Sequence, residues 1–349
     1  MTVIENAQTK VRCIEGDLPA DFDDYQFCAN EAVYVEDRFH DPEAHSSAYR
    51  CFEQTYHQLS AGSYLGETST IRVGNGCSVL FERYNREMDQ WGALTDDSYT
   101  LFFHIDPAAS VKVGQAAFGG NDVVLLSKGG DFDLRTMPGV TYCAISFDAG
   151  IITRVLQSHY PDLVENGSLL FPTSVVSDPV SAKLFRQFAA TIEASAKQVK
   201  SAPVQKGILL GVENSLKSVV ADVLAHHIHS VSHRSNQPSN RLDVAFDCRR
   251  VLRERKGVDL PIGNLAKQFG VSRRKLEYLF REEFGRSPAA YRKIILLNYL
   301  RAALSEEKNR SKTIGDVAAE FSVWSLGQMA KEYKEFFSQL PSETKNRPN

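Results

Sequence analysis

The sequence has no uncharged apolar run approaching the ~20 residues that are needed to span a bilayer. Its first ten residues, MTVIENAQTK, lack the basic start and the apolar centre of a signal peptide. Cysteine is scarce and dispersed, with six residues in 349 and no Cys-x-x-Cys pair that would indicate zinc, redox chemistry or a dense disulfide framework. These absences exclude a secreted or membrane class and predict a cytoplasmic protein with reduced thiols.

Motifs for common catalytic sites are also absent. There is no Gly-x-Ser-x-Gly elbow and no Gly-rich phosphate-binding loop. A catalytic metal in a small β-barrel needs two or three histidines and a carboxylate that converge from strands. The strand-rich region offers only His104, which we interpret as a core or surface histidine. We therefore expect no cofactor and no enzymatic activity.

A denser histidine group near the middle of the chain leaves a metal site as an open alternative. Its members fall at three- or four-residue steps that suit one helical face: Asp222, His226, His229 and His233, with His227 beside them. They lie where a helix runs into a polar segment, a position that favours a solvated helix end over a metal site.

Charge is distributed unevenly along the chain, although the net charge is only −3. Residues 241–349 contain 22 Lys and Arg against 14 Asp and Glu, whereas residues 1–240 contain 18 against 29. The polar stretch 230–241 (SVSHRSNQPSNR) separates the two halves and has the composition of an exposed linker. The opposite signs predict two tasks, with the basic half facing a polyanion, unless its basic residues merely form a solvated face.

The acidic half changes character along its length. Residues 65–147 alternate short apolar runs with turn signals such as 74–76 (Gly-Asn-Gly), which predicts a β-sandwich or small barrel. Two helices should follow, over 177–200 and 205–228. The first should bury a stripe of Val180, Leu184, Phe188 and Ile192. The second carries a coiled-coil-like seam that we expect to form a dimer contact, the alternative being packing on its own β domain: Leu209, Val212, Leu216, Val219 and Val223.

The basic half contains a helix-turn-helix pattern. A short amphipathic helix over 260–269 is followed by a tight turn at Gly270, and Ser272 is placed to cap a second helix, Arg273–Phe284. That second helix should pack on the first through Leu276, Leu279, Phe280 and Phe284.

The pattern occurs a second time further along the chain, and internal repetition makes it more specific than one copy. Thr313 and Asp316 are placed to form a capping box, a turn follows at 322–324, and Ser325 should cap a helix over Leu326–Phe337. Buried positions there should be Met329, Tyr333 and Phe337. Between the copies, Ser287 and Pro288 should begin a rigid helix of about 17 residues, able to hold two recognition helices for successive major grooves.

From about Leu260 to Thr344 the chain resembles the DNA-binding domain of the AraC/XylS family of bacterial transcription regulators. The matching positions include Leu265-Ala266, Val271-Ser272, Leu276, Phe280, Phe284-Gly285, Pro288, Tyr291, Ile314, Asp316, Val317-Ala318, Trp324-Ser325, Phe337, Pro341 and Ser342-Glu343. The run 324–333 (WSLGQMAKEY), with 132–136 (FDLRT) in the first half, is similar to a subgroup that includes ethanolamine-operon regulators.

Three positions depart from the family pattern. Ser322-Val323 replaces the usual Gly-Phe, Leu296 replaces an arginine common in the linking helix, and Tyr278 replaces an arginine frequent in the first recognition helix. The departures bear on base preference and on the tightness of the second turn, not on the fold.

Exposed early positions of the two recognition helices should contact base edges, while the flanking positions should contact phosphate. In the first recognition helix we expect Arg274, Glu277 and Tyr278 at base edges, with Ser272, Arg273 and Arg281 nearer the backbone. The corresponding places in the second helix are Ser325, Leu326, Gly327, Gln328 and Lys331. Before the first motif lies a basic group that we interpret as a solvated helix face with incidental phosphate contact: Arg249, Arg250, Arg253, Arg255 and Lys256.

The resulting expectation is an α+β, multidomain regulator. Residues 1–172 would form a β-rich, cupin-like effector-sensing domain, 173–233 a helical dimerisation segment, 234–241 a linker and 242–349 the DNA-binding domain. Its partners would be double-stranded promoter DNA, an unidentified small-molecule effector, a second copy of the chain and, for an activator, RNA polymerase, at the bacterial nucleoid. A metal-binding enzyme with a DNA-binding appendage and a constitutive DNA-binding protein are the alternatives.

Overall fold

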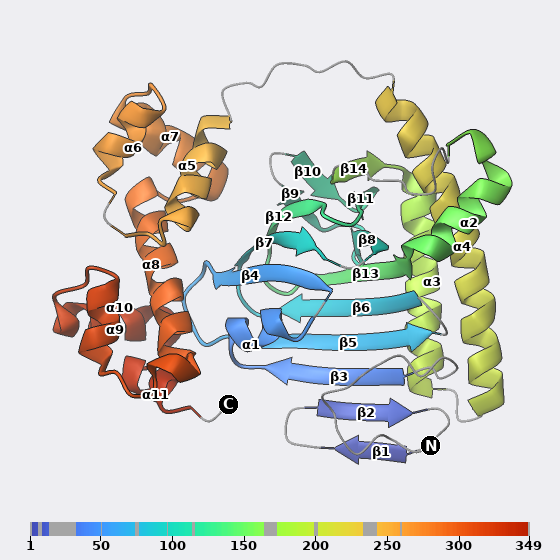
Figure 1. The fold of residues 1–349 in the computed structure, drawn as a ribbon, viewed down its shortest axis with the longest axis horizontal. Helices are drawn as coiled ribbons and strands as arrows, with labels where there is room; N and C mark the ends of the chain where they lie inside the picture. Colours follow the sequence, from blue (N-terminus) through green and yellow to red (C-terminus); the bar gives the residue numbers. More distant parts are fainter. Residues whose placement is uncertain are drawn as a thin grey trace. The chain divides into compact units, whose positions relative to one another are not determined.

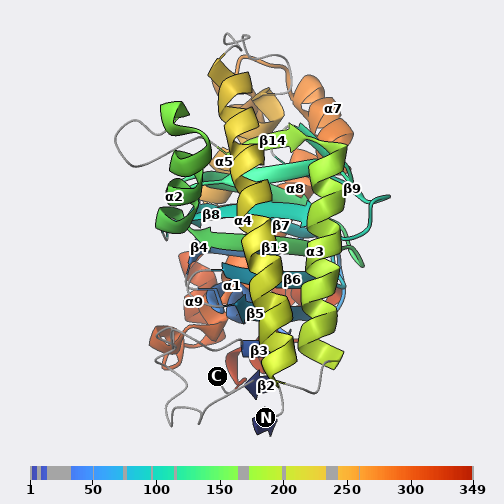
Figure 2. The ribbon, with the colours of Figure 1, turned by 90° about the vertical axis from the view of Figure 1, so that its right-hand side faces the viewer.

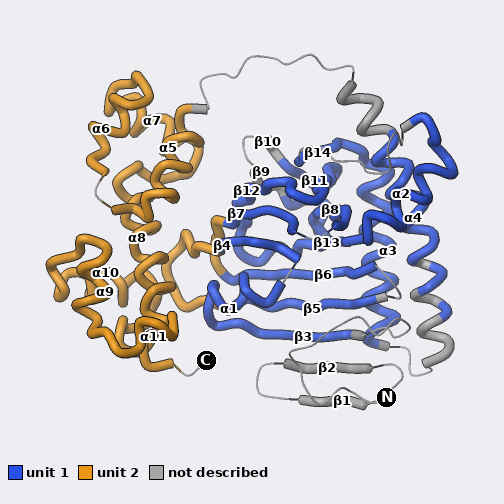
Figure 3. Tube along the Cα trace, viewed as in Figure 1, with its two compact units in different colours: residues 1–55, 65–85, 90–236 blue, residues 56–64, 86–89, 237–349 orange. Residues whose placement is uncertain are grey.

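The structure is a computed structural model that describes residues 2–5, 9–13, 33–49, 51–73, 77–95, 97–113, 116–163, 173–198, 202–232, 243–258 and 260–347. The chain divides into two compact units (Figure 3). Unit 1 comprises Met1–Thr55, Leu65–Asn85 and Gln90–Asn236, and unit 2 comprises Tyr56–Tyr64, Arg86–Asp89 and Gln237–Asn349. The α+β, multidomain class is confirmed. Two short pieces of the N-terminal half nevertheless belong to unit 2, which the proposed boundaries at 172 and 241 did not anticipate.

Unit 1 is built on two sheets, a larger antiparallel one and a smaller one (Figure 1). The larger has nine strands in the order β1 (Thr2–Glu5), β2 (Thr9–Cys13), β3 (Val33–Phe39), β5 (Gly66–Val73), β6 (Cys77–Tyr84), β13 (Thr141–Asp148), β8 (Ser98–His104), β11 (Asp122–Leu126) and β14 (Ser174–Ser177). The smaller has the order β10 (Ala116–Gly119), β9 (Ser110–Val113), β12 (Asp131–Thr136), β7 (Met88–Leu94) and β4 (Phe52–Gln58). This arrangement confirms the expected β-rich first half.

The central strands explain where the core of unit 1 lies. In β8 every residue from Tyr99 to His104 is buried, so both faces of the larger sheet are covered there. The Gly-Asn-Gly turn at 74–76 lies outside the described residues, but β5 and β6 on either side of it pair in antiparallel register, Val73 opposite Cys77. On one face, Phe102 of β8 meets Phe118 of β10 with ring centroids 5.7 Å apart, so side chains of the two sheets contact each other there.

Three helices cover the other face of the nine-stranded sheet: α2 (Ala149–His159), α3 (Pro179–Gln198) and α4 (Ala202–Ser232) (Figure 2). Phe185 of α3 stacks on Phe103 of β8, with ring centroids 5.9 Å apart. Of the predicted apolar stripe of α3, Ile192 is buried and Leu184 and Phe188 are half-buried, whereas Val180 is 69% exposed. Phe185 and Ala189, which the prediction did not include, complete the buried side. The remaining helices of the unit are short: α1 (Pro42–Ser47) and η1 (Pro161–Leu163).

Unit 2 contains the helical part of the chain: α5 (Asp243–Glu254), α6 (Ile262–Gln268), α7 (Arg273–Phe284), α8 (Pro288–Ser305), η2 (Glu307–Asn309), α9 (Ile314–Glu320), α10 (Leu326–Phe337) and α11 (Pro341–Lys345). Its apolar side chains form two clusters, and α8 contributes to both. Tyr291 and Ile295 belong to the first cluster with α5, α6 and α7. Leu300 and Leu304 belong to the second cluster with α9 and α10. The predicted tandem arrangement on one linking helix is therefore confirmed.

No helix among the described residues combines the length and the apolar character needed to cross a membrane.

Candidate nucleic-acid interface

The first helix-turn-helix motif, α6 and α7, is fixed by local hydrogen bonds that the sequence predicts. Gly270 adopts a left-handed conformation with φ 64° between the helices, and the Ser272 hydroxyl accepts a hydrogen bond from the amide of Lys275 at 3.1 Å. The predicted inward side chains Leu276, Leu279 and Phe280 are buried. Because these anchors orient α7 along its whole length, the opposite side of the helix faces solvent.

The exposed side of α7 carries the predicted DNA contacts. Tyr278 is 65% exposed, and Arg274 and Arg281 are also exposed. Arg273 and Glu277 pair with each other across one helical turn, Nε to Oε1 at 3.1 Å. Glu277 is half exposed and already has a cationic partner, so its predicted contact with a base edge requires that this exposed pair open.

The second motif, α9 and α10, repeats the first with one difference in its caps. Thr313 and Asp316 form the predicted capping box, with the Thr313 amide donating to Asp316 at 2.9 Å and the Asp316 amide donating to Thr313 at 3.1 Å. Ser325 occupies the position before α10 but accepts no capping bond there, which corrects the prediction. Its backbone ψ of 85° holds it away from the geometry that Ser272 and Ser287 adopt at their helices.

The exposed side of α10 is less basic than that of α7. Leu326, Gly327, Gln328 and Lys331 are exposed, as expected, while Met329, Tyr333 and Phe337 are buried. Gln328 donates to Glu332 at 2.7 Å. Trp324, which lies in the turn just before the helix, is 81% exposed. An apolar ring at the start of a recognition helix is a further candidate contact.

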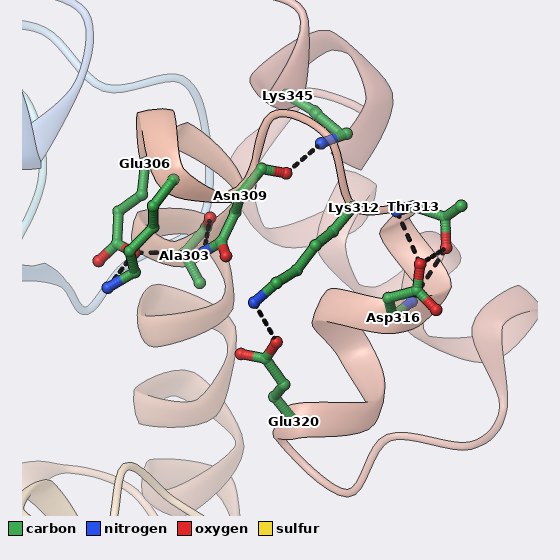
Figure 4. Close-up of polar contacts among 9 residues, drawn as sticks. Ala303, Glu306, Asn309, Lys312, Thr313, Asp316, Glu320 and Lys345 are labelled. Carbon is green, nitrogen blue, oxygen red and sulfur yellow. Dashed lines mark hydrogen bonds and ion pairs between the residues drawn. The ribbon is translucent and has the colours of Figure 1, made fainter.

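The loop between α8 and α9 is held by a compact set of polar contacts (Figure 4). Asn309 donates from its side chain to the carbonyl of Ala303 at 2.9 Å, and Lys345 of α11 donates to the carbonyl of Asn309 at 2.8 Å. Lys312 pairs with Glu320 at 2.6 Å, which joins the loop to the end of α9. These bonds fix the second motif on the C-terminal end of α8.

Two of the family departures have a clear place in unit 2. Leu296, where the family commonly has arginine, is partly buried against the second apolar cluster. Ser322, where the family usually has glycine, keeps the left-handed conformation with φ 57°. The turn geometry is therefore preserved without glycine.

The basic residues of α5 required a correction. Arg250, Arg255 and Lys256 are exposed, as predicted. Arg249 and Arg253, however, are only 3% and 6% exposed, and both bind the carboxylate of Asp89. They are not a solvated face, and no local sequence signal identifies a partner 160 residues away.

The predicted dimer seam on α4 is partly used inside one chain. Leu216 and Val223 are buried within unit 1, and Val219 is half-buried. For Leu216 and Val223 this burial agrees with the alternative, a helix packed on its own β domain, because α4 packs against α2, α3 and β5. The side chains of Leu209 and Val212 lie outside the described residues. A dimer contact stays a prediction that must use other residues of α4.

The alternative prediction of a metal site is not supported by any set of ligands among the described residues. The side chains of His226, His227, His229 and His233 lie outside the described residues, while Asp222 accepts a hydrogen bond from the hydroxyl of Tyr160 at 2.9 Å. Among the residues that the structure describes, no three His, Cys, Asp or Glu gather as a metal site would require. His104 is fully buried, and burial lowers its pKa.

Polar groups lie between the two sheets of unit 1. Gln90 of β7 donates to the hydroxyl of Tyr84 of β6 at 2.8 Å, which bridges the sheets. The ring of His104 lies edge-on to Phe118 and to Tyr142. Within the described chain, Gln90 Oε1 and His104 Nε2 are buried without a hydrogen-bond partner. Such groups normally bind water or a ligand, because leaving them unpaired is costly.

The helical region is similar to known proteins. The helix-turn-helix domain family matches residues 265–347, which run from within α6 through α7, α8, α9, α10 and α11. The transcriptional activator of the XylDLEGF operon of Pseudomonas putida is 25% identical over 149 residues, covering 43% of this chain and 44% of the relative. XylDLEGF operon transcriptional activator 2 of the same organism is 31% identical over 85 residues, covering 24% of this chain and 54% of the relative. The chain thus aligns with about half the length of these relatives.

Solved structures give weaker similarity. The AraC-like transcriptional activator CuxR is 12% identical with a TM-score of 0.35, covering 70% of this chain and 86% of CuxR. ToxT of Vibrio cholerae strain SCE256 with bound unsaturated fatty acid is 12% identical with a TM-score of 0.27, covering 84% of this chain and 95% of ToxT.

Proposed function

We propose that the chain is a DNA-binding transcription regulator of the AraC/XylS family that binds promoter DNA through α7 and α10 together. Its residues 265–347 match a helix-turn-helix domain family, and it is similar to the activator of the XylDLEGF operon. The observation that supports the proposal is the repeated motif. Two recognition helices with matching inward anchors are attached to opposite ends of α8. A helix of 18 residues is about 27 Å long at 1.5 Å per residue, which approaches the ~34 Å between successive major grooves.

The two recognition helices should make different contacts. On α7, the exposed Arg274 suits guanine, which arginine binds through two hydrogen bonds, and Arg281 should lie nearer the phosphates. On α10, Gln328 suits adenine, and the exposed Leu326 suits a thymine methyl. The site should therefore contain two unlike blocks about one helical turn of DNA apart.

Selection of binding sites from a random duplex library by the full chain tests this proposal. We expect two enriched blocks separated by about 10 base pairs. Arg274→Ala should lose preference within one block and Gln328→Ala within the other, whereas Lys308→Ala, which removes an exposed lysine of η2, should change neither. Enrichment of a single block that both variants affect would contradict binding by both recognition helices. Absence of any enrichment would contradict sequence-specific binding.

We further propose that a small molecule binds between the two sheets of unit 1 and controls the regulator. Gln90 Oε1 and His104 Nε2 are the buried polar atoms that support this location. A ligand that bonds to them would stabilise the folded chain in proportion to its concentration above Kd. Thermal unfolding of the full chain against a panel of small polar and amphipathic compounds should reveal a stabiliser whose effect is lost in Gln90→Ala. A stabiliser that acts equally on that variant would place the site elsewhere.

Activation is the mode of regulation that we propose, because the relatives from Pseudomonas putida are transcriptional activators. An activator would also contact RNA polymerase, and a dimer would place two copies on one promoter. Transcription in vitro from a promoter with the selected site should increase when the full chain is added. A decrease would identify a repressor instead.

A further inference from the structure

A buried carboxylate joins Arg86–Asp89 to the helices of unit 2. Asp89 Oδ1 accepts a hydrogen bond from Arg249 Nη2 at 2.8 Å, and Oδ2 accepts one from Arg253 Nε at 3.1 Å. Arg253 Nη2 and the Tyr291 hydroxyl donate further short hydrogen bonds to the same group. Burial by itself raises the pKa of Asp89, but the charges of Arg249 and Arg253 outweigh burial and hold it well below its usual range. The carboxylate is therefore charged.

A second carboxylate of the same segment binds a third arginine. Glu87 Oε2 accepts from Arg286 Nη2 at 2.6 Å, and Arg286 also donates from Nη1 to the carbonyl of Leu59 at 2.6 Å. Arg286 follows directly on α7 and its C-cap Gly285. Two acidic side chains from the N-terminal half of the sequence thus bind three arginines that flank the first motif.

The other N-terminal segment of unit 2 supports this arrangement. The backbone N–H of Gln58 donates to Asn298 Oδ1, and Asn298 Nδ2 donates to the backbone carbonyl of Gln58, each at 2.9 Å. The Asn298 side chain on α8 thus forms the pair of hydrogen bonds that a neighbouring strand would form. Leu59 is buried in the first apolar cluster. The amide of Gly62 donates to the carbonyl of Phe336 on α10 at 2.7 Å. The two segments consequently contact the linking helix and both motifs.

We propose that Arg86–Asp89 is an inhibitory latch, in which Asp89 withholds Arg249 and Arg253 from DNA until the segment is released. The inference rests on the proposed DNA binding and adds its regulation. In the latched state the carboxylates reduce the positive charge that unit 2 presents to the phosphate backbone. On release, the two guanidinium groups of α5 become available as additional phosphate contacts, which raise affinity for any duplex and steepen its salt dependence.

The position of Asp89 in β7 provides a route for that release. Successive side chains of a strand point to opposite faces, and the next residue, Gln90, lies between the sheets of unit 1, bonded to Tyr84. A molecule that binds Gln90 Oε1 would act on the strand that carries the latch, one peptide bond away. The proposed effector site and the latch are therefore joined covalently.

Duplex binding by full-length Asp89→Asn tests the latch. The matched control is Asp247→Asn, which makes the same substitution on α5 but disrupts only the exposed pair with Arg250, Oδ1 to Nη2 at 3.1 Å. Both variants gain one unit of net charge. Binding of a random-sequence duplex would be measured between 50 and 200 mM salt. Two freed arginines should make the affinity advantage of Asp89→Asn over the native chain grow about tenfold as salt falls across this range. Asp247→Asn should show no such growth.

Each outcome decides between the two proposals. If the native chain and Asp247→Asn bind DNA and Asp89→Asn behaves like the control, the latch is wrong while DNA binding stands. If none of the three binds, the proposed function itself fails. Adding Arg249→Gln and Arg253→Gln to Asp89→Asn should return the salt dependence to the native slope, and an unchanged steep slope would overturn the role of these arginines.

A milder variant tests the latch if Asp89→Asn does not fold. Should Asp89→Asn lose its cooperative thermal transition, Tyr291→Phe replaces it, because that change removes one donor to Asp89 and leaves all charges in place. It should shift affinity and salt dependence in the same direction by a smaller amount. A folded Tyr291→Phe variant with native binding at every salt concentration would also overturn the latch.

Discussion

Gly270 and Ser322 occupy the same place in the two helix-turn-helix motifs, and both have left-handed backbone conformations, with φ 64° and 57°. The residue after each makes the same bond, Val271 to the carbonyl of Ala266 and Val323 to that of Ala318, both at 3.0 Å. The turn is thus identical in geometry and different in residue type. Serine adopts this conformation at a cost that glycine avoids.

Ser322→Gly should therefore stabilise the chain by about 1 kcal/mol, less the extra entropy that glycine has in the unfolded state. Gly270→Ser is the reverse control and should destabilise by a similar amount, because a Cβ at Gly270 meets no atom within 4 Å and only the backbone conformation is penalised. Urea unfolding of both variants measures the effect. Destabilisation by Ser322→Gly would mean that the serine side chain stabilises the turn.

Arg274→Ala should weaken binding to a selected site by about 1–3 kcal/mol and relax preference at one base pair, because a bidentate contact is lost. Arg281→Ala should instead weaken all sequences together and reduce the salt slope by about 1. Titration of both variants against the selected site and a scrambled duplex separates the two cases. Equal losses of Arg274→Ala on both duplexes would identify a phosphate contact.

Leu216→Glu should unfold or strongly destabilise unit 1, because the new charge would be buried among apolar side chains. Leu216 belongs to the seam that the sequence predicts as a dimer contact, but its side chain is buried within unit 1. Leu210→Glu is the informative partner, since Leu210 lies on the same helix and is 39% exposed. It should retain native stability and, if α4 contacts a second copy, shift sedimentation toward the monomer. If Leu216→Glu is a folded dimer, the burial of Leu216 within unit 1 is contradicted.

His57 should make the chain less stable as pH falls below neutral. The histidine is fully buried, and burial lowers its pKa to about 3, whereas an unfolded histidine titrates near 6.5. Protons therefore bind the unfolded chain first, so stability is complete above about pH 6.5 and is lost as pH falls toward 3.

The expected loss from His57 alone is about 2 kcal/mol at pH 5 relative to pH 7.5. The ring centroids of His57 and Tyr299 lie 4.7 Å apart, and His57→Phe keeps an aromatic ring in this place. The variant should lose about that much less unfolding free energy than the native chain as the pH falls. His159→Gln changes an exposed histidine of α2 and should leave the native profile unchanged. If the unfolding free energies of the native chain and of His57→Phe fall equally with pH, the inference that His57 is buried as a neutral imidazole is wrong.

The sequence by itself determined the two helix-turn-helix motifs. Helix α7 runs over Arg273–Phe284 and α10 over Leu326–Phe337, as predicted, and the Ser272, Ser287 and Thr313 caps form as expected. Caps, proline at a first helical position and helical apolar spacing act within a few residues. Such signals are complete in the local sequence.

Only the tertiary structure decided which charged and apolar faces are buried. Arg249 and Arg253 look like a solvated basic run until Asp89 is placed beside them, and Leu216 looks like a dimer seam until α4 lies on its own sheet. The assignment of 56–64 and 86–89 to the helical unit likewise depends on contacts more than 150 residues apart in sequence. Periodicity reports that a face is apolar or charged, but the partner that covers it is chosen by long-range packing, which no local pattern encodes.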